Sequence, residues 1–280
     1  MKRLLFISSV LMMVMVSCQK EIDLGTGANS FGDLLIKIQR VTPASGDTSI
    51  VNFQWDALRR LVKYSATGEV DNTPSDFTHV IARAADGKIL RINSESAFSI
   101  ADSIAYFPYY QSGSSRLAYV IDSQYTFAGT IMDSMVYTYN GGGRIIEREI
   151  FSGLPGFLFP TGKQAYTYDG NGNLTVIIDS IPDGVGGYDL SATTTITFDS
   201  HRPIYQAGEE AFIIADMDPV SISKNNSNKQ TKVDALFPGN SYTATGSQYQ
   251  FNAADKPIKF TMSMIPQPPG YDMKLTMFYQ

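Results

Sequence analysis

The stretch AYTYDGNGNLTV, residues 165–176, has the side chains best placed to hold a metal ion. Asp169 and the two asparagines that follow it at alternate positions match the first three ligands of an EF-hand-like calcium loop. Position 6 of that pattern is Leu174 rather than glycine, and position 12 is Ser180 rather than glutamate. Because the sharp turn and the bidentate ligand are both missing, we expect no calcium site and no other metal site.

Phosphate binding is the second chemistry that a glycine-rich loop could support. Gly162-Lys163 resembles the end of a Walker loop, but Gln164 stands where Ser or Thr is needed. The preceding Gly156 is one residue too far away, and no helix is expected to follow. We therefore expect no nucleotide and no other cofactor.

Paired carboxylates are the third candidate, because two of them can serve a glycosidase. Glu209 and Glu210 are adjacent and follow a glycine, which is typical of a loop. Glu147 and Glu149 alternate around Arg148, which is typical of a solvated strand face. Neither pair is assigned a catalytic role.

The two histidines of the chain, His79 and His201, are 122 residues apart and belong to no HxxxH or HExxH pattern. His201 is expected in a solvated turn, and His79 at the end of an apolar strand. No GxSxG elbow is present. A Ser-His-Asp arrangement stays open, because its members can come from anywhere in a chain.

The N-terminus carries the clearest targeting signal. Two basic residues precede the apolar run Leu4–Val16, which has the length of a signal h-region and is too short for a spanning helix. The run ends just before Cys18, the only cysteine. The sequence MVSC, residues 15–18, resembles the lipobox of bacterial lipoproteins, which implies cleavage after residue 17 and lipidation of Cys18. The alternative is an ordinary secretory signal with a chance cysteine.

The mature chain is acidic. Removal of residues 1–17 takes away Lys2 and Arg3, so that 20 basic and 27 acidic side chains remain, a net charge of −7. This balance argues against nucleic acid and against a polybasic membrane patch. A lipidated Cys18 would also leave no thiol for a disulfide, a metal or a nucleophile.

The stretch YTYDGNGNL belongs to a repeat along the chain. Its shared pattern is an aromatic residue, a polar residue, an aromatic residue, then Asp or Asn, often followed by Gly. The residues before the Asp or Asn fall near positions 55, 83, 108, 139, 168, 198, 224 and 251. This steady spacing predicts a repeat architecture, with the copies at 83, 108 and 224 the weakest.

Each unit is interpreted as a β-hairpin. Asp or Asn at the first turn position favours a type I turn, and a glycine three residues later supplies the positive φ of a G1 bulge. Alternating aromatics before the turn indicate one face of a strand. The opening stretch is therefore interpreted as a hairpin turn.

The Tyr-x-Tyr-Asp-x-x-Gly-Asn-Leu unit resembles the YD repeats of Rhs-type bacterial surface proteins. Over residues 50–280 the chain resembles the YD-hairpin lipoproteins of Bacteroidota, a family of unknown function. Trp55, Phe198 and Phe251 replace the second tyrosine, and glycine is absent from three of the five firm copies. These departures indicate structural repeats that have drifted and hold no shared site.

We expect an all-β fold of antiparallel β-hairpin repeats, 14 to 16 strands in a curled or barrel-like meander. The predicted organisation is a signal peptide at 1–17, a flexible tether at 18–31 and a single domain at 32–280. A transmembrane barrel is the alternative, although residues 144–149 place charges on both faces of one strand.

Two apolar loops, 151–162 and 264–273, are expected to cover an end of the sheet, or to present Phe157, Phe159 and Tyr271 to a ligand.

The predicted function is a lipid-anchored, non-catalytic binding or scaffold module with a glycan or protein ligand. A secreted hydrolase acting on glycan or peptide is the alternative. Residues 19–23 resemble the export signal of Bacteroidota surface lipoproteins, which implies the outer face of the outer membrane, with a periplasm-facing anchor as the alternative.

Overall fold

The structure is a computed structural model that describes residues 34–70, 73–74, 76–96, 103–126, 129–204, 209–215, 222–266 and 272–280. Cys18, Tyr271 and residues 19–23 therefore lie outside the described residues. The strands are β1 (Leu35–Thr42), β2 (Asp47–Trp55), β3 (Leu61–Val70), β4 (Thr73–Pro74), β5 (Phe77–Arg83), β6 (Ile89–Ser96), β7 (Ser103–Tyr110), β8 (Leu117–Thr126), β9 (Gly129–Tyr139), β10 (Ile145–Leu154), β11 (Phe157–Tyr168), β12 (Leu174–Pro182), β13 (Tyr188–Phe198), β14 (Ser227–Asp234), β15 (Tyr242–Phe251), β16 (Pro257–Ile265) and β17 (Met273–Tyr279). The helices are α2 (Glu209–Ile214) and the 3-10 turn η2 (Pro238–Asn240).

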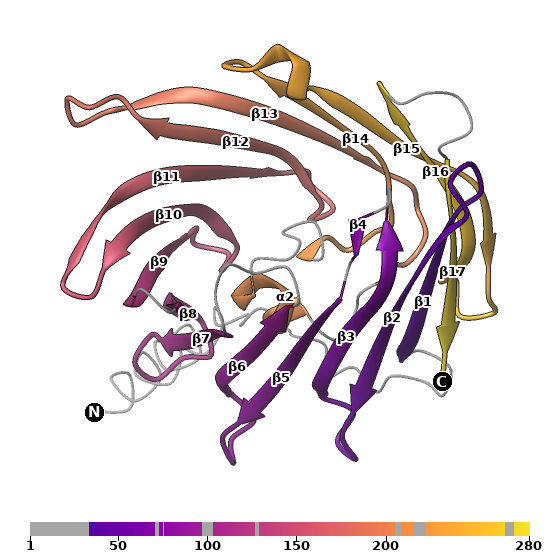
Figure 1. Ribbon diagram of the computed structural model, residues 1–280, viewed down its shortest axis with the longest axis horizontal. Coiled ribbons are helices and arrows are strands. Elements are labelled where there is room, and N and C mark those ends of the chain that lie inside the picture. The colour runs from indigo at the N-terminus through magenta and orange to yellow at the C-terminus, as the bar shows by residue number, and fades with distance from the viewer. Residues whose placement is uncertain are drawn as a thin grey trace, which may run out of the picture.

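The strands form a closed antiparallel meander (Figure 1). Each long strand pairs with its neighbours in sequence, and β1 pairs with both β2 and β17, which closes the sheet into a barrel. The short β4 pairs only with β3, so sixteen strands of the described chain make the wall. The expected all-β hairpin meander is confirmed. Closure removes the free edges that such a wide sheet would otherwise expose.

Every second connection of the meander lies on one rim, here called the turn rim, and it carries the repeat motif. Asp169 Oδ1 accepts the N–H groups of Asn171, Gly172 and Asn173, and Asn140 and Asn252 act in the same way in their turns. The residue three positions later has positive φ: Gly87, Gly143 and Gly172 in three turns, and Arg59 and Asp255 where glycine is absent. The predicted turn chemistry is therefore present.

In several units the residue in the second aromatic slot bonds to the unit before it. The hydroxyl of Tyr168 donates to the carbonyl oxygen of Ile145, the first residue of the preceding returning strand, over 2.7 Å. Arg83 replaces the aromatic residue in its unit, and its Nη2 donates to the Leu61 carbonyl over 3.3 Å. The same contact recurs at Trp55–Leu35 and Tyr279–Pro257, whereas the Tyr110 hydroxyl accepts the Ile89 N–H over 3.0 Å.

A basic residue from the preceding turn covers four of the tyrosine rings, those of Tyr110, Tyr139, Tyr168 and Tyr279. Arg144 lies 5.5 Å from the ring centroid of Tyr168, and Arg116 lies 5.6 Å from that of Tyr139. The Arg144 guanidinium also lies against Gly172, the glycine of the next turn. A Cβ on Gly172 would approach Arg144 Nη2 to 2.8 Å. The glycine therefore provides space for a neighbouring unit in addition to its positive φ.

The start of β1 and the end of β17 meet on the turn rim, where they take the place of an eighth turn. The N–H of Gln280 donates to the carbonyl oxygen of Leu34 over 2.8 Å, in place of a continuous turn. Tyr279 fills the aromatic slot there. The expected repeat near residue 224 is wrong, and the eighth unit is the one that closes the barrel.

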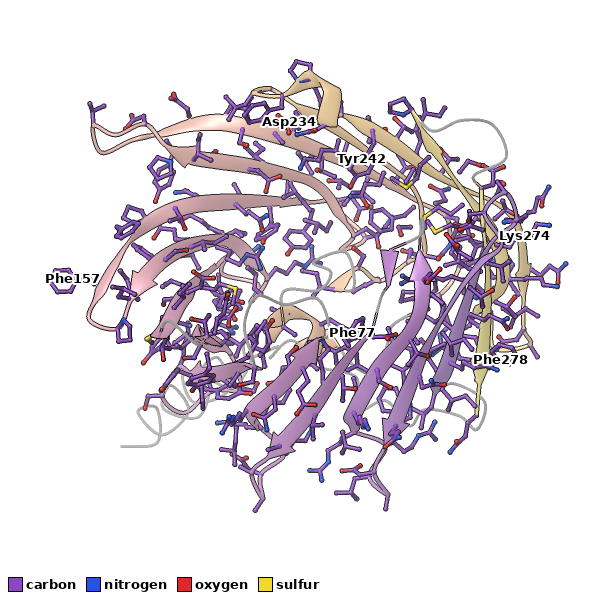
Figure 2. All side chains as sticks on the ribbon, in the orientation of Figure 1. Phe77, Phe157, Asp234, Tyr242, Lys274 and Phe278 are labelled. Atoms are coloured by element: carbon purple, nitrogen blue, oxygen red, sulfur yellow. The ribbon has the colours of Figure 1, made fainter. Side chains whose placement is uncertain are left out.

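The two faces of the wall differ in chemistry. Residues that point inward are mostly apolar and buried, such as Ile38, Tyr64, Ile92 and Phe260. Residues on the outward face include threonines and charged side chains together with exposed apolar ones such as Val80, Val136 and Ile178. Figure 2 shows Lys274 on the outer side of β17. The outward charges include Lys37, Lys63, Arg91, Glu147, Glu149, Lys163, Lys229 and Lys259.

Candidate functional site

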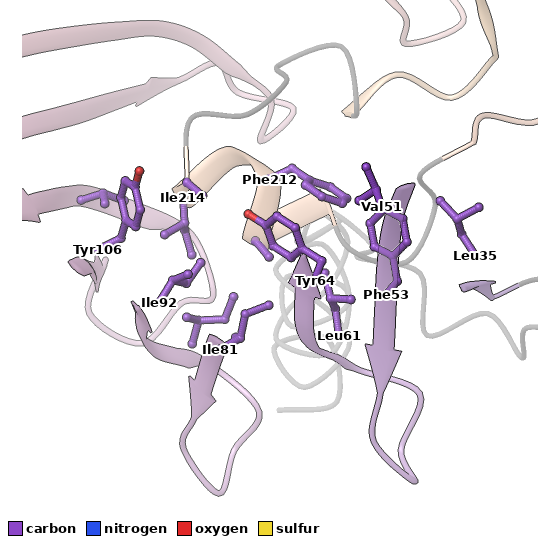
Figure 3. Close-up of a cluster of buried hydrophobic side chains, with 14 of the residues drawn as sticks. Leu35, Val51, Phe53, Leu61, Tyr64, Ile81, Ile92, Tyr106, Phe212 and Ile214 are labelled. Carbon is purple, nitrogen blue, oxygen red and sulfur yellow. The ribbon is translucent and has the colours of Figure 1, made fainter. Parts of the chain in front are cut away.

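Helix α2 lies inside the barrel, near the turn rim (Figure 1). The ring of Phe212 packs 5.5 Å from that of Tyr64 and 6.3 Å from that of Phe53 (Figure 3). Ala211 and Ile214 are fully buried, and Figure 3 places Ile214 beside Ile92 and Tyr106. The helix is therefore a plug whose apolar residues complete the core. Within the described residues, no helix is long and apolar enough to cross a membrane.

The plug belongs to a long insertion in one hairpin turn. The Asp199 N–H donates to the Asn226 carbonyl over 3.1 Å, and the Asn226 side chain donates to Asp199 Oδ2 over 2.8 Å. These bonds close the turn although β13 and β14 are separated by residues 199–226. The returning leg of the insertion is held by the neighbouring turn, because Leu174 N–H donates to Ser223 Oγ over 3.0 Å.

Glu210 anchors the plug to the wall. The hydroxyl of Tyr110 donates to Glu210 Oε1 over 2.5 Å, and Arg83 Nη1 lies 3.6 Å from Oε2. Burial raises the pKa of Glu210, although Tyr110 and Arg83 act in the opposite direction. Burial and the nearby Glu210 also raise the pKa of Tyr110.

The sequence pointed to Glu210 but missed Tyr110 and Arg83, which contact it. The repeat pattern could have pointed to both residues, because both fill its second aromatic slot. The side chain of Glu209 lies outside the described part of the structure. The described contacts of Glu210 therefore anchor the plug to Tyr110 and Arg83.

The other carboxylate pair lies on the outer wall of β10. Glu147 Oε2 pairs with Lys163 Nζ over 2.6 Å. Arg148, between the two glutamates, points inward and is buried, and its Nη2 donates to Gln164 Oε1 over 2.6 Å. Charges do lie on both faces of this strand, as expected. Glu147 and Glu149 therefore face the outside of the barrel.

The inner wall beside the plug carries a polar network. Gln164 Oε1 also accepts the hydroxyl of Tyr166 over 2.5 Å, and Gln164 Nε2 donates to Asp179 Oδ1 over 2.6 Å. Arg148, Tyr166 and Phe212 line a cavity of about 20 Å³ between the wall and the plug. That volume accommodates about one water molecule, so this cavity is too small for a sugar or peptide substrate.

The two histidines lie on different elements, His79 on β5 and His201 at the start of the insertion. His79 is buried on the inner face of β5, with its ring 4.5 Å from Tyr64 and 4.9 Å from Phe77, so the expected strand-end position is wrong. His201 begins the insertion, where its ring stacks on Phe251 at 3.7 Å and Nδ1 lies 2.7 Å from Asp255 Oδ1. It is therefore packed rather than freely solvated.

No group of three or more His, Cys, Asp or Glu residues that could hold a metal ion occurs in the described ranges. Asp169 shows why the opening stretch is a turn, since backbone N–H groups occupy its Oδ1. Those bonds, chiefly that from the Asn173 N–H, lower the pKa of Asp169.

The expected apolar loop at 151–162 is the hairpin of β10 and β11. Leu154 pairs with Phe157 at its tip, and Phe157 lies at the outer edge of the molecule in Figure 2. It therefore projects from the rim opposite the turn rim, here called the open rim, and does not cover the barrel end. Of the second loop, residues 264–266 and 272–273 are described, and Ile265 is exposed.

By sequence, no protein-family model and no curated protein matches this chain. In structure the chain is similar to a porin-like protein from Bacteroides uniformis, with a TM-score of 0.56 at 11% identity, over 87% of this chain and 96% of that one. A porin-like protein from Bacteroides vulgatus gives 0.52 at 9% identity, over 88% and 98%. At these identities the similarity shows a shared β-barrel fold.

Proposed function

We propose that the protein is a lipid-anchored, non-catalytic binding or scaffold module of the bacterial cell envelope. One observation carries the proposal: the outer wall is charged at mid-strand while the interior is apolar and plugged. A membrane-spanning barrel needs an apolar outward band about 25 Å tall. Glu149 and Lys163, which pair near the middle of β10 and β11, would lie within such a band, at a cost of up to about 2–4 kcal/mol for the lysine.

Attachment to the membrane then depends on Cys18. Two or three acyl chains hold a protein stably, whereas a single chain binds only marginally. The porin-like neighbours from Bacteroides support an envelope protein by fold alone. Residues 19–23 favour display on the cell surface, and a periplasm-facing anchor is the alternative.

The anchor is tested by fractionating cells that produce the native chain and the Cys18→Ala variant. We expect the native protein in the membrane fraction and the variant in the soluble fraction. A variant that stays in the membrane would overturn the lipid anchor. Protease treatment of intact cells then decides orientation, because full protection before lysis would contradict surface display.

The rival function is a hydrolase that uses Glu209 or Glu210. Burial raises the pKa of Glu210, as it does for a general acid, and this observation keeps the alternative open. A panel of polysaccharides and proteins separates the two functions. Turnover by the native protein that Glu210→Gln or Glu209→Gln abolishes would replace our proposal, provided that the variant keeps its melting temperature.

A further inference from the structure

Among the described connections, the tip of the β10–β11 hairpin carries the largest group of exposed apolar side chains. Phe157 is 80% exposed, Leu154 62% and Phe159 60%, and Leu158 between the two phenylalanines is also exposed. Residues 150–162 contain no charged side chain. Both faces of this ribbon are apolar, while the wall below it is charged. An apolar group of this size indicates a contact with another surface.

The two strands of the hairpin bond to each other up to its tip. Leu154 pairs with Phe157 and Gly153 with Leu158, so the ladder reaches the tip. The hydroxyls of Ser152 and Thr161 lie 3.0 Å apart, and the Thr161 hydroxyl lies 3.3 Å from the Ile150 carbonyl oxygen. The β10–β11 ladder bonds one edge of residues 157–162 up to the tip, whereas the ladder between β11 and β12 starts at Lys163. A segment that leaves water for lipid must bond its polar groups internally, so this tip suits the hydrated interface of a membrane rather than its hydrocarbon core.

We propose that this tip inserts into the interface of the phospholipid membrane that holds the lipid on Cys18, as a second membrane contact. The inference rests on the proposed function for the identity of that membrane. It assigns a role to Phe157 and Phe159 that neither lipidation nor the barrel fold requires.

The chain is long enough for both contacts. Leu34 lies on the turn rim, sixteen residues after Cys18, and an extended segment of that length spans about 55 Å. The twelve residues of β11 span about 40 Å. Residues 18–34 can therefore run from the membrane along the barrel to the turn rim while the open rim faces the lipid.

The charges beside the tip select the lipid. The neighbouring β12–β13 hairpin exposes Asp183 and Asp189, and residues 181–190 contain no Lys or Arg. Anionic headgroups would be repelled, so the structure favours a zwitterionic surface. Binding driven by the apolar tip should also depend little on salt.

The experiment uses the chain from residue 18 with Cys18→Ser, so that its result does not depend on the anchor. All strands of the closed wall are present in that chain. It is sedimented with phosphatidylcholine vesicles and with vesicles that contain phosphatidylglycerol. We expect binding to phosphatidylcholine, a fall of about tenfold or more in partitioning for the double variant Phe157→Ser with Phe159→Ser, and weaker binding to the anionic vesicles.

Leu58→Ser is the matched control, because Leu58 is 71% exposed but lies on the opposite rim. It should leave partitioning unchanged, and circular dichroism should show all variants folded. No binding to phosphatidylcholine, binding to anionic vesicles alone, or an equal loss with Leu58→Ser would overturn the proposal. Self-association in sedimentation velocity that the double variant abolishes would assign the tip to a second copy instead. Because this chain carries no lipid, failure here leaves the anchor of Cys18 to its own test.

Discussion

The hydroxyl of Tyr168 lies 2.7 Å from the carbonyl oxygen of Ile145, a residue of the preceding hairpin. This contact joins two repeat units, whereas the turn bonds of Asp169 act within one unit. Burial raises the pKa of Tyr168, so the hydroxyl keeps its proton and donates. Equivalent donors along the turn rim make the repeat a property of the barrel as well as of each hairpin.

Tyr168→Phe should therefore lower the free energy of unfolding by about 1 kcal/mol, because one half-buried hydrogen bond is lost with little change in shape. Urea denaturation followed by circular dichroism measures the change. Tyr109→Phe is the control, since Tyr109 lies on the outer wall and is 45% exposed. Equal effects of the two substitutions would show that the contact with Ile145 contributes nothing.

Gly172→Val should destabilise the protein by about 1 kcal/mol or more. The φ of Gly172 is +97°, which a β-branched residue resists, and its Cβ would meet Arg144. Gly170→Val is the control, because Gly170 lies in the same turn with open space around its Cβ position. A melting temperature unchanged by Gly172→Val would contradict both reasons.

The turn rim was predictable from the sequence because its chemistry is local. Asp169 bonds to residues two to four positions ahead, and these spacings are visible in the chain. A repeat at position 83 was expected, but the role of Arg83 as the donor was missed, since a guanidinium there replaces a hydroxyl. Closure between Leu34 and Gln280 was equally hidden, because no local pattern records a contact across the whole chain.

The candidate site was less predictable for the same reason. Glu210 was singled out by its charge, but its contacts with Tyr110 and Arg83 depend on where the insertion enters the barrel. The asparagines at 225 and 226 resembled a repeat turn, although they close the turn that Asp199 begins. Sequence alone could not show that the intervening residues fold inward.

Calcium should leave the melting temperature unchanged, because the oxygens of Asp169 accept bonds from its own turn. Asp169→Ala should destabilise the protein by about 1 kcal/mol through the loss of those bonds. Asp169→Asn should lower the free energy of unfolding by less, since Asn140 and Asn252 accept the equivalent N–H bonds in their own turns. A calcium-dependent rise in melting temperature that Asp169→Ala removes would restore the metal site.

His79 should make stability depend on pH. Burial lowers its pKa from 6.5 to about 4 in the folded protein, while the unfolded chain keeps the ordinary value. Between those values the unfolded state binds more protons, so stability is full above about pH 6.5 and falls as the pH drops toward 4. The loss attributable to His79 is about 3 kcal/mol at most.

Glu210 changes the stability in the opposite direction as the pH falls, because a carboxyl with a raised pKa binds protons more readily in the folded state. The contribution of His79 is therefore the difference between the native protein and His79→Phe, measured by urea denaturation at pH 7, 5.5 and 4.5. Phenylalanine keeps an aromatic ring beside Tyr64 and Phe77 but cannot take a proton. We expect the loss of stability between pH 7 and 4.5 to be smaller in the variant. Identical losses in both proteins would show that His79 is not protonated on unfolding, which would contradict its burial among these rings.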